Sequence, residues 1–182
     1  MRTIGLDTSS KSIAWSVLDD GKLIRYGEFY IEGKNNSEKL ADCKNKMEAL
    51  YKSGEFQADY IYCEEAVKVI SITTLTVMAK YLGVVQSVLG QVGCPVICIV
   101  PVAWQTYIGN PNLKREEKTE LLLKHREIKT QAHKAKFFRE YRKNRTKEWC
   151  KKMFDVVVDN DNQSDSIGLA WFAYDTNREH ED

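Results

Sequence analysis

The sequence predicts an α/β domain in which a mixed five-stranded sheet is flanked by helices. Three observations support this class: an apolar N-terminal stretch with a hairpin signal, two later apolar runs of strand length, and helical periodicity between and after those runs. The elements follow the order strand, strand, strand, helix, strand, helix, strand, helix. This order predicts three antiparallel strands followed by two parallel ones, because helices connect the later strands.

The first three predicted strands are close together in the sequence. They cover residues 2–7, 13–18 and 22–31. Asp19-Asp20-Gly21 joins the second strand to the third, and an Asp-Gly pair is typical of a two-residue hairpin turn. The N-terminal part of the sheet is therefore expected to be an antiparallel meander.

The other elements follow from the spacing of apolar residues. The fourth strand is predicted to end at Cys63, and the fifth to span residues 95–100. Helices are predicted from a cap at Ser37 to residue 51, and over residues 74–91, 115–127, 131–152 and 162–176. No repeat or flexible linker divides the chain, so residues 1–182 are predicted to form a single domain.

The composition indicates a broad class of protein. Hydrophobic residues make up 43% and charged residues 29% of the 182 residues, which is typical of a soluble globular domain. No apolar run approaches the length needed to span a bilayer, and no targeting segment precedes the first strand. Five irregularly spaced cysteines favour a reducing compartment over a disulfide framework. We therefore expect a cytoplasmic protein with no membrane partner.

Charge is distributed unevenly along the chain. The formal net charge is +1, but residues 114–152 contain fifteen Lys or Arg, six Glu and no Asp. This basic segment has a local charge of +9, and the rest of the chain therefore carries −8. A basic block on an otherwise acidic chain is typical of a protein that binds a polyanion. We predict that residues 114–152 form a helical nucleic-acid-binding segment.

Two acids stand where predicted core strands end. Asp7 follows the apolar run Thr3–Leu6, and Glu64 follows the run that ends at Cys63. Side chains alternate along a strand, so Glu64 and Glu65 point to opposite faces and only one can join Asp7. We favour Glu64. An ordinary solvated acid at a strand end is the alternative for each position.

Two further acids lie at the start of the last predicted helix. Asp161 and Asp165 are four residues apart, which places them on nearly the same helical face, and Asn162 lies on that face as well. Capping of the helix is an alternative role for Asp161 and Asn162. Acids on separate elements that converge form a hard-oxygen site, which suits Mg²⁺ or Mn²⁺.

Four segments of the chain together carry a family pattern. They are TIGLDTSSKSIAWSV, DYIYCEE, QTYIG followed by lysines, and DNQSDSIGLAWFAYD. In this order they resemble the successive motifs of the RuvC-type Holliday junction resolvases, which belong to the RNase H-like superfamily. The bacteriophage and poxvirus branches are the nearest in style. The resemblance extends over the whole chain and implies an RNase H-like fold.

The resemblance also implies a set of metal ligands. The first-strand Asp, the fourth-strand Glu and the last-helix Asp of the family correspond to Asp7, Glu64 and Asp165. The fourth family acid lies three residues before the last one, where this chain has Asn162. We predict that Asp161 takes its place, and ligation through the Asn162 amide oxygen is the alternative.

A basic residue near the scissile phosphate is a further feature of the family. Lys114, Arg115 and Lys118 are the candidates here, and their spacing does not choose among them. The predicted nucleic-acid-binding residues are these three with Lys134, Lys136, Arg139, Arg142, Lys143 and Arg145. Phe137, Phe138 and Tyr141 either stack on bases or cover the core.

The functional prediction is a structure-selective endonuclease that resolves four-way, and other branched, DNA with paired symmetric nicks. Asp7, Glu64, Asp161 and Asp165 would hold two Mg²⁺ ions, replaceable by Mn²⁺, which activate water and stabilise the leaving oxygen. Paired nicks require two sites, and the family is homodimeric, so we expect a homodimer through the apolar helix at 74–91. No small-molecule cofactor is expected. The expected location is the cytoplasm of a bacterium or of a virus-infected host cell.

Three alternatives differ in what they require. Another RNase H-like nuclease, cutting flaps or RNA–DNA hybrids, would use the same acids. A non-enzymatic binder of structured DNA would need only the basic segment. A small actin-like nucleotide-binding protein would use the hydroxyl-rich turn after Asp7 to bind phosphate, but that architecture needs two domains and a second phosphate loop.

Overall fold

The computed structural model describes residues 1–54, 56–65, 71–94 and 96–178. Its centre is a five-stranded sheet with the strand order β3-β2-β1-β4-β5. The strands are β1 (Arg2–Thr8), β2 (Ser12–Asp19), β3 (Lys22–Tyr30), β4 (Tyr60–Glu64) and β5 (Val96–Ile99). The first three are antiparallel neighbours, and β4 and β5 run parallel to β1. This confirms the predicted mixed sheet; Pro95, predicted to begin the last strand, lies outside the described residues.

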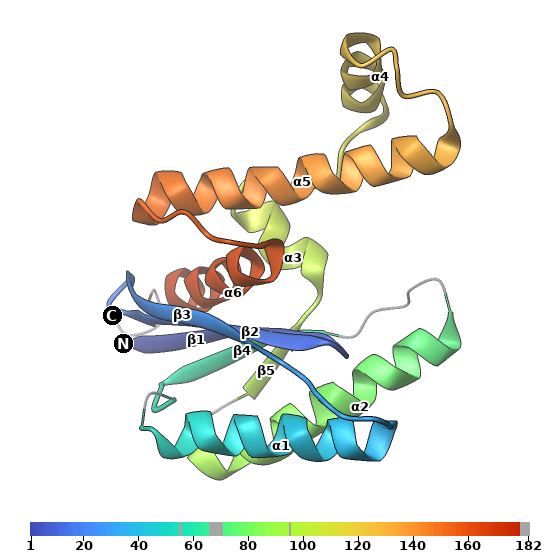
Figure 1. Ribbon diagram of the computed structural model, residues 1–182. Coiled ribbons are helices and arrows are strands. Elements are labelled where there is room, and N and C mark those ends of the chain that lie inside the picture. Colours follow the sequence, from blue (N-terminus) through green and yellow to red (C-terminus); the bar gives the residue numbers. More distant parts are fainter. Residues whose placement is uncertain (55, 66–70, 95, 179–182) are drawn as a thin grey trace.

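Helices cover both faces of this sheet (Figure 1). They are α1 (Asn36–Lys52), α2 (Ile72–Leu89), α3 (Pro101–Tyr107), α4 (Arg115–Lys124), α5 (Gln131–Phe154) and α6 (Asp161–Asn177), with a 3₁₀ turn at Gly90–Val92. One face is covered by α1 and α2 and the other by α6, and α5 crosses over the outer side of α6. The short helix α4 stands over the N-terminal half of α5, on the side of α5 that faces away from the sheet.

The main hydrophobic core lies between the sheet and the pair α1 and α2. Ile4, Leu6 and Ile61 from the strands are fully buried there against Met47 of α1 and Val85 of α2. These strand residues alternate with side chains that point to α6, as expected for strands that are covered on both faces.

Small residues let α6 approach the opposite face of the sheet closely. A Cβ atom on Gly5 would lie 2.0 Å from the backbone oxygen of Ser166, so only glycine fits at this point of β1. The hydroxyl of Thr3 donates to the Ala170 carbonyl at 2.9 Å, and that of Ser16 donates to the Ser166 carbonyl at 2.8 Å. Backbone of β1 therefore packs against backbone of α6 here.

The structure corrects several predicted helix ends. The cap of α1 is Asn35, whose side chain accepts from the Glu38 amide at 3.0 Å, and not Ser37. Ser71 caps α2, which begins two residues earlier than predicted. Asn160 caps α6 by accepting from the Gln163 amide, so capping does not explain the presence of Asp161 and Asn162. In each case a side chain before the apolar pattern begins the helix.

One helix lies outside the predicted elements. Pro101, which directly follows the predicted fifth strand, is the first residue of α3. Proline favours this position because its missing N–H would be unpaired there and its φ suits a helix. The seven-residue helix places Trp104, which is fully buried, beside α6.

The expectation about apolar runs was also wrong for α2. Among the described helices, α2 has the length and composition of a possible membrane span. Five of its residues nevertheless pack into the core against the sheet and α1: Tyr81, Leu82, Val85, Val88 and Leu89. A helix in this position contributes to the sheet core, and its high apolarity follows from that role together with an outer face on which Lys80 is the single charged residue of the helix.

Candidate active site

The strand register brings acids from three strands into one row. Asp7 of β1 pairs with Ala14 of β2, and Ala14 pairs with Glu28 of β3. On the other side, the Leu6–Cys63 pair places Glu64 of β4 beside Asp7. Residues in one row across a sheet point to the same face, which here is the α6 face.

Asp7 is surrounded by other carboxylates. Burial raises the pKa of its carboxyl well above the ordinary value, and the charges of Glu64, Asp165, Asp161 and Glu28 raise this pKa further, in that order. Carboxylates that share a buried site cannot all ionise easily, because each charge repels the next. The predicted acids therefore do come together at Asp7.

Glu64 lies at the same point, as predicted. Burial raises the pKa of Glu64, and hydrogen bonds with Trp104 and Asp7 partly offset this effect. The Trp104 indole nitrogen donates to Glu64 Oε1 at 3.3 Å. Glu65 is exposed, which agrees with the choice of Glu64 over its neighbour. Trp104 lies on α3, a helix outside the predicted elements, so its role at Glu64 could not be predicted.

Asp165 connects the acids to a cleft. Burial raises the pKa of this carboxyl well above the ordinary value, and the charges of Glu64 and Asp161 add to the effect, while Lys143 and Arg142 oppose it. The cleft has a volume of about 540 Å³ and lies between α3, α4, α5 and α6. Its charged lining consists of Asp165, Lys118, Arg139, Arg142 and Lys143.

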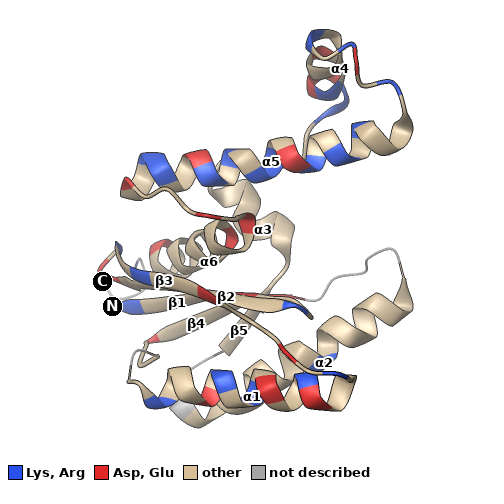
Figure 2. Cartoon of the chain, viewed as in Figure 1, with Lys and Arg blue, Asp and Glu red and all other residues tan. Residues whose placement is uncertain are grey.

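The cleft distinguishes among the predicted basic residues. Of the three candidates near the scissile phosphate, Lys118 lines the cleft together with Asp165. Arg115 faces a separate surface hollow, and Lys114 is the N-cap residue that precedes α4. Figure 2 shows Lys and Arg distributed along α4 and α5. Among the others, Lys136 pairs with Glu140 at 3.8 Å, and Arg145 donates to the Gly109 carbonyl at 2.7 Å. Lys134 is half-buried near the start of α5.

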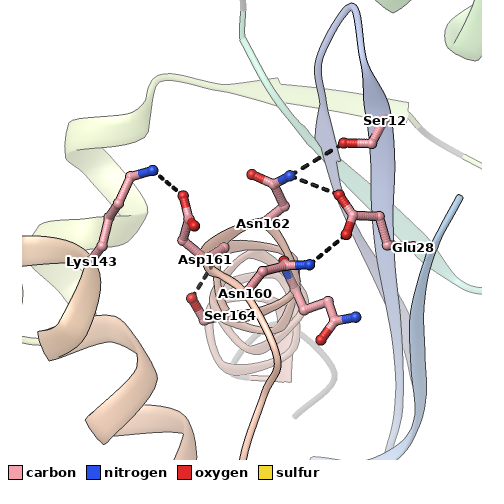
Figure 3. Close-up of polar contacts among 8 residues, drawn as sticks. Ser12, Glu28, Lys143, Asn160, Asp161, Asn162 and Ser164 are labelled. Atoms are coloured by element: carbon pink, nitrogen blue, oxygen red, sulfur yellow. Dashed lines mark hydrogen bonds and ion pairs between the residues drawn. The ribbon is translucent and has the colours of Figure 1, made fainter. Parts of the chain in front are cut away.

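Asp161 is engaged by a lysine. Burial opposes ionisation of Asp161, but the hydrogen bond and charge of Lys143 outweigh it, so the pKa of Asp161 is lowered. Figure 3 shows Lys143 of α5 reaching the carboxylate of Asp161 at the start of α6. Lys143 was predicted as a DNA-binding residue, and the structure gives it this acid as a partner.

Asn162 is engaged on its other side by Glu28. The Asn162 amide nitrogen donates to Glu28 Oε1 at 2.7 Å and approaches Ser12 Oγ at 3.3 Å (Figure 3). Asn160 donates to the second Glu28 oxygen at 2.5 Å. Glu28 was not predicted as part of the site. Its position depends on strand register, which the residue pattern around it did not reveal.

Comparison with known proteins shows which fold carries this site. No family model and no curated protein matches the chain. Among solved structures, Thermus thermophilus RuvC in complex with Holliday junction substrate matches with a TM-score of 0.68 at 11% identity, covering 98% of this chain and 96% of that chain. The chain has the RuvC fold. A second T. thermophilus RuvC structure gives a TM-score of 0.66 at 12% identity, with coverages of 98% and 97%.

A eukaryotic structure matches as well. The yeast mitochondrial Holliday junction resolvase Ydc2 matches with a TM-score of 0.51 at 13% identity, covering 98% of this chain and 80% of that chain. The RNase H-like fold predicted from the motifs is therefore confirmed. At such low identities, what these matches establish is the RuvC fold, and the role of each residue has to be argued from the geometry of the site.

Phe137, Phe138 and Tyr141 of α5 form a ring cluster of their own, whereas Trp149 and Phe154 of the same helix pack against buried core residues. Phe137 contacts the rings of His125, Phe138 and Tyr141 at centroid distances of 4.8, 5.6 and 6.3 Å. Lys118 Nζ lies 5.8 Å from the Phe138 ring centroid. This cluster joins the tips of α4 and α5 and thereby helps to place Lys118 at the cleft.

The acids of this RuvC fold offer the oxygen ligands that Mg²⁺ and Mn²⁺ prefer. Within the described ranges, no three His, Cys, Asp or Glu side chains already lie close enough to hold one ion together. Burial, followed by the charges of neighbouring acids, raises the pKa of Asp7 and Asp165. A cation bound among these oxygens would offset both effects and favour the ionised carboxylates.

Proposed function

We propose that this protein is a divalent-metal-dependent endonuclease that resolves four-way DNA junctions. One observation carries the proposal. Asp7, Glu64 and Asp165 come from three separate elements, and Asp165 lines a cleft together with four cations. Burial, followed by the charges of Glu64 and Asp165, raises the pKa of Asp7. Acids that serve stability are paired with bases, whereas Asp7 is buried among other acids, so the site is arranged for a function at some cost in stability.

Asp7, Glu64 and Asp165 are the proposed ligands of two Mg²⁺ or Mn²⁺ ions, with Asp161 or Asn162 completing the set. Bound there, the metal would supply a deprotonated water and stabilise charge on the leaving oxygen. Trp104 holds Glu64 in place through its indole N–H. This hydrogen bond fixes one carboxylate while the others adjust.

The cations of the cleft are proposed to bind the DNA backbone. Lys118, Arg139 and Lys143 line the cleft with Asp165, so a phosphate bound by them lies next to the acids. Lys118 is the proposed basic residue nearest the scissile phosphate, because it is the candidate that shares a cleft with Asp165. The rest of the basic segment would contribute affinity that depends on salt and carries little sequence information.

The proposed enzyme acts as a homodimer in the cytoplasm. Paired nicks across a junction with near-two-fold symmetry require two sites with the same symmetry. A groove of about 490 Å³ between α1 and α2, lined by Leu40, Val84 and Val88 among others, lies on the face of the molecule opposite α6. A second copy packed here would leave both acid sites open. Val84→Glu should shift the protein to monomers in light scattering, and a dimer that persists would exclude this interface.

The decisive experiment incubates the purified protein with a labelled four-way junction and Mg²⁺ or Mn²⁺. We expect two symmetric nicks, which Asp165→Asn abolishes while junction binding in EDTA persists. Lys118→Ala is expected to slow cleavage more strongly than Arg115→Ala, which removes a charge outside the cleft. A junction bound but never cut with either metal would refute the enzymatic proposal and favour a binder of structured DNA.

A substrate panel tests the nuclease alternative. Junctions, flaps, duplexes and RNA–DNA hybrids share the phosphodiester that the acids would attack, so the acids do not distinguish among them. We expect the fastest cleavage on four-way junctions. Preference for flaps or hybrids would keep the metal-dependent mechanism and change the substrate.

A further inference from the structure

We propose that Glu28 is a positioning residue that aims the carbonyl oxygen of Asn162 at the acid site, so that Asn162 serves as the fourth oxygen ligand. This inference rests on the proposed metal-dependent function and assigns a role to a strand residue outside the predicted ligand set. Its basis is the hydrogen-bond arrangement at the start of α6.

The Asn162 amide has a defined orientation. A carboxylate oxygen accepts hydrogen bonds, so the group that faces Glu28 must be the amide nitrogen of Asn162. That nitrogen has two hydrogens, and the structure provides two acceptors, Glu28 Oε1 at 2.7 Å and Ser12 Oγ at 3.3 Å. The carbonyl oxygen therefore points away from Glu28, as Figure 3 shows.

The Asn162 oxygen points to the side of the molecule where the acids lie. Ala14 of β2 pairs with Asp7 on one side and with Glu28 on the other, so Glu28 lies in the same row across the sheet as Asp7. In Figure 3 Asn162 lies between Glu28 and Asp161, with its nitrogen toward Glu28 and its oxygen on the side of Asp161.

Both carboxylate oxygens of Glu28 accept hydrogen bonds from the start of α6. One of them accepts from Asn160 Nδ2 at 2.5 Å, and Asn160 caps α6 through the Gln163 amide at 3.0 Å. Glu28 is thus held by Asn160, the residue that caps α6, while it orients the Asn162 amide of the same helix. The carboxylate is half-buried and shares its sheet face with Asp7, so it can act on the site without being a ligand.

Asn162 and Asp161 differ in the partners that they would have to release in order to bind a cation. Asp161 is paired with Lys143, and the lowered pKa of Asp161 reflects that partner. A carboxylate held by a lysine ammonium must give up that contact before it binds a cation. The Asn162 oxygen requires no such exchange, because its amide is already oriented by Glu28 and Ser12.

The test is a double-mutant cycle read out as Mn²⁺ affinity of the full-length protein without DNA, by titration calorimetry or electron paramagnetic resonance. Glu28→Gln replaces one carboxylate oxygen with an N–H₂ group, so a single oxygen remains to accept from both Asn160 and Asn162, and the Asn162 amide is no longer held in one orientation. We expect Mn²⁺ binding to weaken by about 10–100-fold, the range typical for partners that orient metal ligands. Glu32→Gln, which removes an exposed charge just after β3, is the matched control and should bind as the wild type does.

The double variant Glu28→Gln with Asn162→Asp completes the cycle. The new amide can accept from Asn160 and donate to the new carboxylate, whose second oxygen faces the acids. Adding Asn162→Asp should therefore restore Mn²⁺ binding in the Glu28→Gln background much more than it improves binding in the wild type. Thermal unfolding of each variant shows whether it folds.

Two results would overturn the inference. Mn²⁺ binding by Glu28→Gln that equals that of the wild type would show that Glu28 orients nothing, and the proposed function would still stand. Additive effects in the cycle would show that Glu28 and Asn162 act separately. A wild-type protein that neither binds Mn²⁺ nor cuts junctions would remove the proposed function and this inference with it.

Discussion

The two faces of the sheet are built from different kinds of side chain. Toward α1 and α2 the strands present large apolar residues, and Ile4, Leu6 and Ile61 are completely buried there. Toward α6 the central strand β1 presents small or polar residues, Thr3 and Gly5, followed by Asp7. The apolar face supplies free energy of folding through buried area. The other face gives up some of that free energy so that charged groups from β1, β4 and α6 meet.

The largest expected effect is on the close contact of the α6 face. Gly5→Ala adds one methyl group 2.0 Å from the Ser166 carbonyl oxygen and 2.5 Å from the Ala170 nitrogen, and backbone cannot yield there as a side chain can. We expect a loss of about 3 kcal/mol in the free energy of unfolding, measured with urea, together with loss of junction cleavage. A variant with wild-type stability would show that α6 does not pack this closely.

The acids of the same face are expected to destabilise the metal-free protein. Because the pKa of Asp7 is raised in the folded state, the folded state binds more protons than the unfolded one between the two pKa values, so stability falls as pH rises through that window. Asp7→Asn removes this loss. In EDTA it should raise the melting temperature near neutral pH, with the gain shrinking as pH is lowered toward the ordinary carboxyl pKa. A lower melting temperature than the wild type at neutral pH would contradict it.

A change of similar size on the apolar face should cost less. Ile61→Val removes one methylene from the fully buried core without creating a clash, and about 1 kcal/mol is expected. Urea unfolding measures this value, and cleavage per folded molecule should be unchanged. If Ile61→Val cost as much as Gly5→Ala, the two faces would not differ as described.

The smallest expected effect is on the outer surface of α2. A Cβ atom on Gly83 meets no atom within 4 Å, so Gly83→Ala is free of clashes and stabilises the helix by about 0.5–1 kcal/mol. The melting temperature should rise slightly, in contrast to the effect of the same substitution at Gly5. A fall that depends on protein concentration would instead place Gly83 in the dimer interface.

Much of the site could be predicted because its acids terminate elements with strong local patterns. Asp7 and Glu64 end apolar strands, and alternation along β4 excludes Glu65. The spacing of Asp161 and Asp165 placed both on one helical face. Local patterns suffice when the residue lies on a regular element and its neighbours set its direction.

Glu28 could not be placed in the same way. The β2–β3 hairpin begins with Asp19 opposite Lys22, and that register would put Gly27, and not Glu28, opposite Ala14. A register shift between Val17 and Leu18 moves the pairing by one residue. A one-residue shift turns every later side chain to the other face, and here it brings Glu28 to the α6 side.

The sequence by itself determined the order of the strands and helices, the basic segment and the acids that end core strands, because each of these depends on neighbours within one element. Only the tertiary structure decided which basic residue shares the cleft with Asp165, which partner holds Asp161, and that Glu28 belongs to the site. These depend on contacts between residues far apart in the chain, such as Glu28 and Asn162, and on a bulge that local spacing does not encode. Packing distance and strand register, which are properties of the whole fold, determine these contacts.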